Sequence, residues 1–309
     1  MPASALLPST AGLFSLHPPQ IETNFHSCAG NYRTSSSDSE GATSNSKLGR
    51  RGDGGQVPAP GGEGGRRDGV HAGDRPRHRR APRPGGRRRR HLLPEAVGLQ
   101  KNVDEAVERL KAKGITVVGA VCHVSDAQQR KGLIDTAVKN FGHIDILVSN
   151  AAANPTVDGI LEMKEAVLDK LWDINVKASI LLLQDAAPHL RKGSSVIIIS
   201  SITGYNPEQG LAMYGVTKTA LLGLTKALAA EMGPNTRVNC IAPGFVPTRF
   251  ASFLTTNETI RKELTDKITL NRLGSVEDMA AAAAFLASDD ASFITAETIV
   301  VAGGMQSRL

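Results

Sequence analysis

The stretch SSVIIISSITGYNPEQGLAMYGVTK, residues 194–218, joins an apolar run to the start of a helical pattern. The run predicts a buried strand over 194–201, and the pattern predicts a helix over 214–232. Tyr214 and Lys218 stand four positions apart, so they share one face of this helix. A neighbouring ammonium favours phenolate and lowers a phenol pKa that is about 10 without such a neighbour. A phenol of that kind can exchange a proton with an alcohol near neutral pH.

Ser201 gives this pair a chemical context. A pair of this spacing by itself is more often an exposed helix pair, and strand-end capping explains Ser200. Ser201 ends the apolar strand, however, and open α/β sheets bind ligands at the carboxyl ends of their strands. Its hydroxyl can donate to a carbonyl oxygen that gains charge during a reaction. The three side chains together indicate chemistry on a carbonyl or an alcohol.

Strands and helices alternate through the last two-thirds of the chain. We expect strands over residues 115–124, 144–150, 194–201, 237–243 and 296–304, and helices over 101–113, 127–141, 164–190, 214–232 and 276–286. This alternation predicts an α/β fold, a doubly wound parallel sheet with helices on both faces. We interpret the stretch between 244 and 275 as irregular.

Two further strand ends and one helix add candidate residues. The strand end VSNAA carries Asn150 beside small residues that let a flat ligand approach the backbone, and APGFVPT carries Gly244 and Thr248. Because carboxyl ends of parallel strands meet at one edge of a sheet, these residues should converge on the crevice near Ser201. Asn175 lies within the helix expected over 164–190, where Asn competes for backbone hydrogen bonds. A kink or a bound water would explain it.

Residues 1–99 have a different composition. They are Ser-rich, then Gly-rich, then Arg/Pro-rich, which predicts a disordered low-complexity domain that cannot bury enough apolar surface to fold. Eleven arginines and two aspartates give residues 66–90 a charge of +9, whereas the whole chain carries +6, so the remainder carries −3. Such a run could neutralise phosphates, and an Arg-rich nucleic-acid-binding protein is an alternative. The absence of lysine and of interleaved aromatic residues speaks against it.

Several other classes of protein are disfavoured. Three scattered cysteines, Cys28, Cys122 and Cys240, suit neither a disulfide framework nor a metal site and predict a reducing intracellular setting. The sequence has no apolar run of about 18 residues and no basic start followed by an apolar stretch. We therefore expect no membrane span and no secretory signal.

The motifs together are similar to one enzyme family. S-x12-Y-x3-K, an N-A-A strand end and a P-G-x3-T turn, in this order, resemble the short-chain dehydrogenase/reductase family, whose fold is Rossmann-like. The phrases HIDILVSNAAANP, DINVKA, KTALLGLTKALA and RVNCIAPG resemble its branch of peroxisomal NADP-dependent retinol dehydrogenase/reductases, or carbonyl reductases. The resemblance covers residues 100–309 and implies an NADP-dependent oxidoreductase that interconverts alcohols with retinal or with aromatic or apolar ketones.

The resemblance also assigns roles to residues. It implies that Tyr214 exchanges the proton, Ser201 orients the carbonyl, Lys218 tunes Tyr214 and holds the nicotinamide ribose, and Asn175 anchors a relay water. The cofactor-binding residues that it implies are Val124, Asn150, Tyr214, Lys218, Gly244, Val246 and Thr248, and it implies no metal. The departures from the usual family pattern are His123 for Asp, Ala152 for Gly, Val276 for Pro and Ala302 for Asp.

The family's first βαβ unit is missing. No strand, Gly-rich turn and helix precede residue 100, so the disordered Gly/Arg/Pro-rich segment replaces the pyrophosphate cradle. With the strand order 3-2-1-4-5-6-7 that the resemblance implies, the strand at 115–124 loses its neighbour and the strand at 144–149 becomes an exposed edge. We expect poor cofactor binding by the chain as written, and a catalytically silent relative is a further alternative.

A change of reading frame would explain the replacement. Shifted by one base, codons for residues 66–80 can be read as V-A-T-A-S-T-R-G-I-G-L-A-I-A, and those for 85–97 as E-G-A-A-V-V-I-S-S-R-K-Q. These are the missing strand, Gly-rich turn and second strand in the right order. We hypothesise that residues 60–100 are an out-of-frame translation, and the Arg in the second reading would suit the ribose 2′-phosphate of NADP.

Partners and location follow from the resemblance and the last residues. The resemblance implies a homotetramer assembled through two long helices. Ser307, Arg308 and Leu309 form a variant of the Ser-Lys-Leu peroxisomal address, which an import receptor reads. We expect a peroxisomal protein that is otherwise cytoplasmic. The sequence does not rank substrates, although Phe250, Phe253 and Leu254 are candidate apolar walls.

Overall fold

The computed structural model describes residues 5–7, 11–15, 94–248, 250–251 and 257–307. Most of the low-complexity domain expected over 1–99, and nearly all of the stretch 60–100 for which we hypothesise a frame change, lie outside the described residues. The account that follows concerns the α/β part of the chain.

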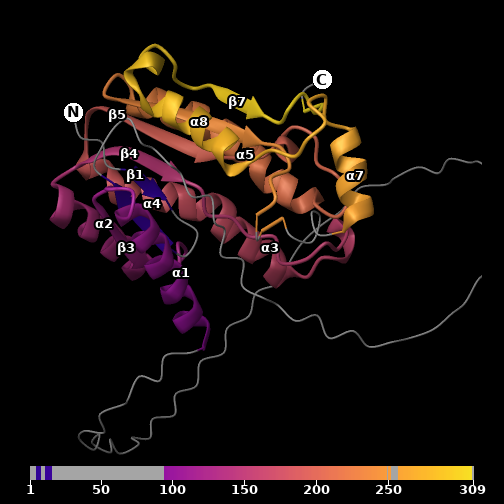
Figure 1. The fold of residues 1–309 in the computed structure, drawn as a ribbon, viewed down its shortest axis with the longest axis horizontal. Coiled ribbons are helices and arrows are strands. Elements are labelled where there is room, and N and C mark those ends of the chain that lie inside the picture. The colour runs from indigo at the N-terminus through magenta and orange to yellow at the C-terminus, as the bar shows by residue number, and fades with distance from the viewer. Residues whose placement is uncertain (1–4, 8–10, 16–93, 249, 252–256, 308–309) are drawn as a thin grey trace, which may run out of the picture. The chain divides into compact units, whose positions relative to one another are not determined.

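Among the described residues, seven strands form one sheet in the order β3-β2-β1-β4-β5-β6-β7 (Figure 1). The strands are β1 (Ala5–Leu7), β2 (Ala11–Ser15), β3 (Val117–Val121), β4 (Ile144–Ser149), β5 (Leu190–Ile199), β6 (Thr236–Pro243) and β7 (Thr298–Val301). β4, β5, β6 and β7 pair in parallel. The Rossmann-like α/β class is confirmed.

The two sheet positions between β3 and β4, which we expected to be empty, are occupied. β1 pairs in parallel with β4, and β2 pairs antiparallel with both β1 and β3 (Figure 1). The expectation that β3 lacks a neighbour and that β4 is an edge strand is therefore wrong. The physical reason is that strands pair through backbone N–H and C=O groups, which almost every residue carries. A hairpin of another sequence can therefore occupy the two positions that the family's first two strands would take.

Both faces of the sheet are buried by alternate residues of the same strands. Along β5, Val196 and Ile198 belong to a core cluster with α2 (Ala127–Phe141), α4 (Ala178–Ala186) and α5 (Ala212–Met232). Ile197 and Ile199 belong to a second cluster with α8 (Val276–Ala287). This alternation explains why β5 is an unbroken apolar run, because a strand covered on both faces needs no polar side.

The helices match the expected positions with three differences. α1 (Pro94–Lys111) begins before residue 101, and the stretch interpreted as irregular contains α7 (Glu258–Asp266). The helix expected over 164–190 is divided into α3 (Glu165–Trp172), a π-helical turn (Asp173–Lys177), α4 and a 3-10 turn (Ala187–His189). None of the described helices is long and apolar enough to cross a membrane.

The N-terminus of α8, which lies next to the site, is held by a set of charged hydrogen bonds. The Ser275 Oγ accepts from the N–H of Asp278 at 3.2 Å, and the Asp278 Oδ2 accepts from the N–H of Ser275 at 2.7 Å. Arg272 also donates to both Asp278 oxygens at 2.6 and 2.9 Å. These hydrogen bonds, with that from Arg272 contributing most, hold the pKa of Asp278 below its usual range.

We expect Asp278→Ala to lower the free energy of unfolding by about 1–2 kcal/mol at pH 7, because the helix cap and the ion pair are lost together. Because the folded-state pKa of Asp278 lies below that of the unfolded chain, its stabilisation is full above about pH 4 and is lost as the pH falls. Urea unfolding followed by circular dichroism should therefore show a smaller difference from wild type at pH 3 than at pH 7.

The matched control is Asp266→Ala, which removes a carboxylate from an exposed pair with Lys262 at 3.6 Å. Exposed pairs of this kind contribute little, so this variant should unfold like wild type. Equal losses in the two variants would contradict a specific role for the α8 cap.

Candidate active site

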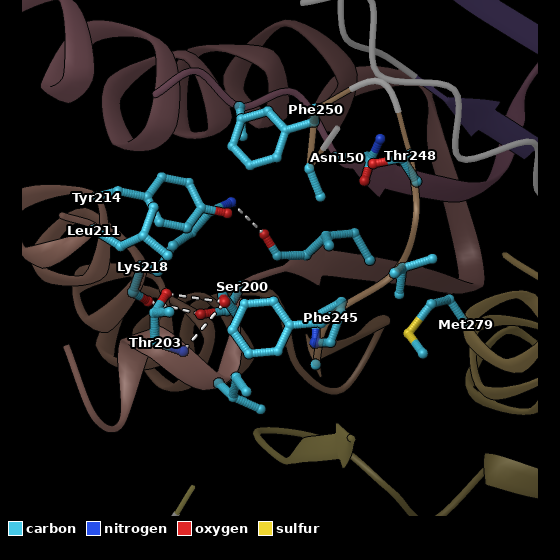
Figure 2. Close-up of a pocket in the computed structure, with 18 residues that line it drawn as sticks. Asn150, Ser200, Thr203, Leu211, Tyr214, Lys218, Phe245, Thr248, Phe250 and Met279 are labelled. Atoms are coloured by element: carbon cyan, nitrogen blue, oxygen red, sulfur yellow. Dashed lines mark hydrogen bonds between the residues drawn. The ribbon is translucent and has the colours of Figure 1, made fainter. Parts of the chain in front are cut away.

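The carboxyl ends of β4, β5 and β6 open on one cavity of about 140 Å³. Figure 2 shows Tyr214 and Lys218 on one side of it and Asn150 and Thr248 on the other. The residues predicted for the site that line this cavity are Asn150, Ser201, Tyr214, Lys218, Gly244, Val246 and Thr248. The structure thus brings together side chains from three strand ends and from the start of α5. Asn175 and Val124 are not among the lining residues.

Lys218 is a buried cation at the end of β5. Its side chain comes from the second turn of α5, it is 1% exposed, and its Nζ donates to the carbonyl oxygen of Ile199 at 2.9 Å. Burial lowers the pKa of this ammonium to about 8. No carboxylate is among the residues described as lining the cavity, so the positive charge is not neutralised by a neighbouring acid there.

Tyr214 lies beside this cation, but its acidity differs from our expectation. The Lys218 Nζ is 5.5 Å from the centroid of the Tyr214 ring, over the ring face. Burial raises the pKa of the Tyr214 phenol, and a hydrogen bond with Ser201 acts in the opposite direction. The raised pKa differs from the lowered one that we expected, because desolvation of the phenolate has the largest effect on Tyr214.

The two adjacent serines have different partners. The Ser200 Oγ donates to the carbonyl oxygen of Lys218 at 2.8 Å, so its proton is used within the fold. The Ser201 Oγ accepts from the N–H of Thr203 at 3.1 Å and from the Thr203 Oγ1 at 2.9 Å. Ser200 thus has a structural partner, but the residue that caps a turn is Ser201, the N-cap of the 3-10 turn Ile202–Gly204, so the interpretation of Ser200 as the capping residue is wrong. That Ser201 faces the ligand stays a prediction.

Asn175 lies behind the cavity and ties two elements together. The Asn175 Oδ1 accepts from the N–H of Ala153 at 2.7 Å, and its Nδ2 donates to the Ala153 carbonyl and to the Thr217 Oγ1, both at 3.0 Å. It is fully buried within the π-helical turn. The π-helical turn is a local distortion of the kind that we considered for an Asn in this helix.

Val124 belongs to the core. It is 5% exposed within the cluster formed by α2, α4 and α5, and its carbonyl oxygen accepts from the Arg130 Nη1 at 2.8 Å. Arg130 also forms a part-buried ion pair with Asp185 at 3.1 Å, so the loop after β3 is tied through Arg130 to α4. His123, one of the departures from the family pattern, is hydrogen-bonded through its Nδ1 to the Ser125 Oγ at 2.7 Å.

The apolar walls of the cavity come largely from residues that sequence reasoning missed. Phe245, Phe250, Leu211 and Met279 line it, and only Phe250 was among the expected walls. The Phe250 and Tyr214 rings are 5.5 Å apart at an angle of 41°. Phe253 and Leu254 lie outside the described residues. No periodic signal marks Leu211 or Met279, because each reaches the cavity from a helix end that only the tertiary fold places there.

The comparisons with known proteins agree with this geometry. A family model described as enoyl-(acyl carrier protein) reductase matches residues 95–306. Tropinone reductase-like 3 from Erythroxylum coca is 71% identical over 210 residues, which cover 68% of this chain and 81% of that protein. Dehydrogenase/reductase SDR family member 4 from Homo sapiens is 49% identical over 213 residues, which cover 68% of this chain and 77% of that protein. The chain belongs to the short-chain dehydrogenase/reductase family.

One similar solved structure contains bound ligands. The gluconate 5-dehydrogenase from Burkholderia cenocepacia, in complex with NADP and tartrate, superposes with a TM-score of 0.62 at 25% identity, covering 68% of this chain and 83% of that chain. Short-chain dehydrogenases/reductases are oxidoreductases that use nicotinamide cofactors, and this chain is one of them by sequence and fold.

The cavity fits the nicotinamide half of such a cofactor. The ammonium of Lys218 has three donor hydrogens, of which Ile199 takes one, so donors remain for a ribose. Gly244 keeps the turn after β6 tight, since a Cβ there would lie 2.9 Å from the Cα of Ala302. Asn150 and Thr248 face the Tyr214 side across the cavity (Figure 2).

The phosphate half does not fit the described residues. A dinucleotide fold needs a Gly-rich turn after its first strand, followed by a helix whose N-terminus meets the pyrophosphate. β1 ends at Leu7, and β2 returns antiparallel from Ala11. A connection of three residues cannot contain a helix, so the described residues place no helix N-terminus at the end of β1.

We expect Lys218→Met to raise the free energy of unfolding at pH 7 by about 1–3 kcal/mol, because it removes a buried charge whose pKa the fold depresses. The folded pKa of about 8 lies below the unfolded value of about 10.4. The gain should therefore be full below pH 8 and disappear as the pH rises towards 10.4. Urea unfolding of both proteins at pH 7 and at pH 10 measures this.

Lys226→Met is the control, because Lys226 is exposed on the same helix. It should change stability little at either pH. A gain for Lys218→Met that is the same at both pH values would show that the buried ammonium is not its source.

Proposed function

We propose that this chain is built for NADP(H)-dependent interconversion of carbonyls and alcohols. The observation that carries the proposal is the convergence of the Ser201 hydroxyl, the Tyr214 phenol and the buried Lys218 ammonium on one cavity with apolar walls. Two hydroxyl donors facing the same space suit a carbonyl oxygen that becomes negative as it is reduced.

The proposed reduction divides the work among these side chains. Ser201 donates a hydrogen bond that holds the carbonyl oxygen, and Tyr214 transfers its proton to that oxygen. A reduced nicotinamide, when bound, supplies the hydride to the carbonyl carbon. Lys218 binds the ribose and stabilises the phenolate that Tyr214 leaves behind.

Reprotonation of Tyr214 involves Asn175 in this proposal. Both amide hydrogens of Asn175 and one lone pair of its Oδ1 are used within the fold. The remaining lone pair can accept from one relay water. Burial raises the pKa of the Tyr214 phenol, so the proposed reduction starts from the protonated phenol.

The substrate class follows from the walls of the cavity. Phe245, Phe250, Leu211 and Met279 offer apolar and aromatic surface, and the lining residues that the structure describes include no acid to bind a cationic substrate. Retinal, which is an apolar aldehyde, and aromatic or apolar ketones fit such walls. The resemblance to the retinol dehydrogenase/reductase branch supports the same class.

The preference for NADP and the place of action are proposals that rest on similarity. The NADP complex of the Burkholderia cenocepacia enzyme and the resemblance to the NADP-dependent branch support NADP, with Val124 and Asn150 on the adenine side. The same resemblance supports a homotetramer. The ending Ser307, Arg308 and Leu309 supports import into peroxisomes by a receptor; its last two residues lie outside the described residues.

A catalytically silent member of the family is a second candidate. The observation in its favour is that β1 and β2 pair antiparallel with three residues between them, so the described residues place no helix N-terminus at the end of β1. Such a chain would keep the oxidoreductase fold, bind cofactor poorly and assemble with complete relatives. No described contact favours the nucleic-acid alternative, whose Arg-rich segment lies outside the described residues.

We expect Tyr214→Phe to reduce turnover of an aromatic ketone with NADPH by about 100-fold or more, because the proton donor is lost. Absorbance of NADPH in steady-state assays measures it. Tyr205→Phe is the matched control, because Tyr205 lies outside the cavity lining, and it should retain activity. Full turnover by Tyr214→Phe would overturn the mechanism.

We expect the chain as written to bind NADPH at least about 100-fold more weakly than a version in which residues 60–100 are replaced by the reread sequence, since the pyrophosphate would gain its helix N-terminus. NADPH fluorescence titration of both proteins gives the two dissociation constants. Equal constants would show that the phosphate half is supplied by other residues of this chain. Transcript sequencing across the region tests the frame change itself.

A further inference from the structure

The direction of one proton decides whether Ser201 helps the reaction. A serine hydroxyl has one donor hydrogen and two acceptor lone pairs. If one lone pair of the Ser201 oxygen has no other donor, it can accept a hydrogen bond from the Tyr214 phenol. The phenolic proton then points at Ser201 and not at the substrate. If both lone pairs are filled, the hydroxyl can only donate.

Thr203 fills both lone pairs. Its N–H and its Oγ1 donate to the Ser201 Oγ at 3.1 and 2.9 Å, and Thr203 is 4% exposed. Ser201 is the N-cap of the short 3-10 turn Ile202–Gly204, so the backbone bond is fixed by the turn itself. Figure 2 shows Thr203 on the same side of the cavity as Tyr214 and Lys218.

We propose that Thr203 is a positioning residue of the reductase site, which makes Ser201 a donor towards the substrate carbonyl. This proposal rests on the function proposed above and adds a residue to it. With both lone pairs of Ser201 occupied, the Tyr214 proton has no acceptor in Ser201 and stays available for the carbonyl oxygen. Both hydroxyl protons are then directed at one oxygen atom.

One further observation agrees with this assignment. Ser200, next in the chain, shows the opposite arrangement, because its own proton is given to the carbonyl of Lys218. Identical side chains at adjacent positions thus differ in role through their partners.

The backbone bond from Thr203 survives a side-chain substitution, whereas the Oγ1 bond does not. Thr203→Val keeps the side-chain shape but removes the hydroxyl that donates to Ser201, so one lone pair of the Ser201 Oγ loses its donor. Thr203→Ser keeps a hydroxyl at this position. Thr136→Val is the matched control, because Thr136 is a half-buried threonine of α2, remote from the cavity, whose Oγ1 donates to the Gly132 carbonyl of its own helix.

Kinetics of ketone reduction separate positioning from folding. Thr203→Val should lower kcat about 10-fold and change KM by less than about 3-fold. The reason is that the hydrogen bond from Ser201 matters most when negative charge develops on the carbonyl oxygen. Thr203→Ser should remain within about 2-fold of wild type. In a Ser201→Ala background Thr203→Val should add less than about 2-fold, because Thr203 acts through Ser201. Equal losses in the two backgrounds would overturn the proposal.

A second readout needs no cofactor, so it stays informative if this chain does not turn over. The absorption band of 4-dimethylaminocinnamaldehyde moves to longer wavelength when its carbonyl accepts hydrogen bonds. Bound to the full chain, it should shift in wild type, in Thr203→Ser and in Thr136→Val. The absorption band of the bound aldehyde should shift less in Thr203→Val and in Ser201→Ala than in wild type. In the double variant the shift should equal that in Ser201→Ala.

The outcomes distinguish the two proposals. A shift that depends on Thr203 in a chain without turnover supports the positioning role and contradicts the proposed activity of this chain. Turnover with a shift that is the same in wild type and Thr203→Val contradicts the positioning role alone. A wild-type chain that gives no shift with the aldehyde also contradicts it, because the Ser201 proton would then not face the cavity.

Discussion

The bond between the buried ammonium of Lys218 and the carbonyl oxygen of Ile199 holds the site together. It joins α5 to the last residue of β5, directly before the two serines, and the Ser200 Oγ adds a second tie to the backbone of Lys218. Gly204 permits this approach, since a Cβ there would lie 2.9 Å from the carbonyl carbon of Lys218. The cation is buried at a cost to stability, which its pKa of about 8 expresses. A destabilising group retained at this point is typical of a functional site.

The sheet and most helices could be predicted because their signals are local. Alternating burial along β5 and the four-residue spacing on α5 are written in neighbouring residues. The π-helical turn around Asn175 could not be predicted in this way. It is stabilised by bonds to Ala153, 22 residues away, and to Thr217, 42 residues away, and such contacts leave no periodic trace in the sequence.

The sequence predicted which residues line the cavity better than it predicted their pKa values. Ser201, Tyr214 and Lys218 could be predicted from their spacing together with the position of Ser201 at a strand end, and all three line the cavity. The direction in which the Tyr214 pKa shifts could not be predicted from the sequence. The shift is caused by burial, and residues that are remote in the sequence, such as Phe245 and Phe250, form the walls around Tyr214. Thr203 escaped notice for a related reason: a hydroxyl that acts on another hydroxyl carries no motif of its own.

The chain shows that closing a sheet and building a cofactor site place different demands on a sequence. Backbone pairing accepts a short hairpin at the positions of two absent strands, because strand pairing is nearly independent of side chains. Phosphate binding requires a helix N-terminus at one particular strand end, and three residues between β1 and β2 leave no length for it. The residues proposed to exchange the proton all lie after Pro94, where α1 begins, whereas the family's phosphate cradle belongs before it. The change in composition near residue 94 therefore coincides with the boundary between these two parts of the proposed site, and the sheet closes without the cradle.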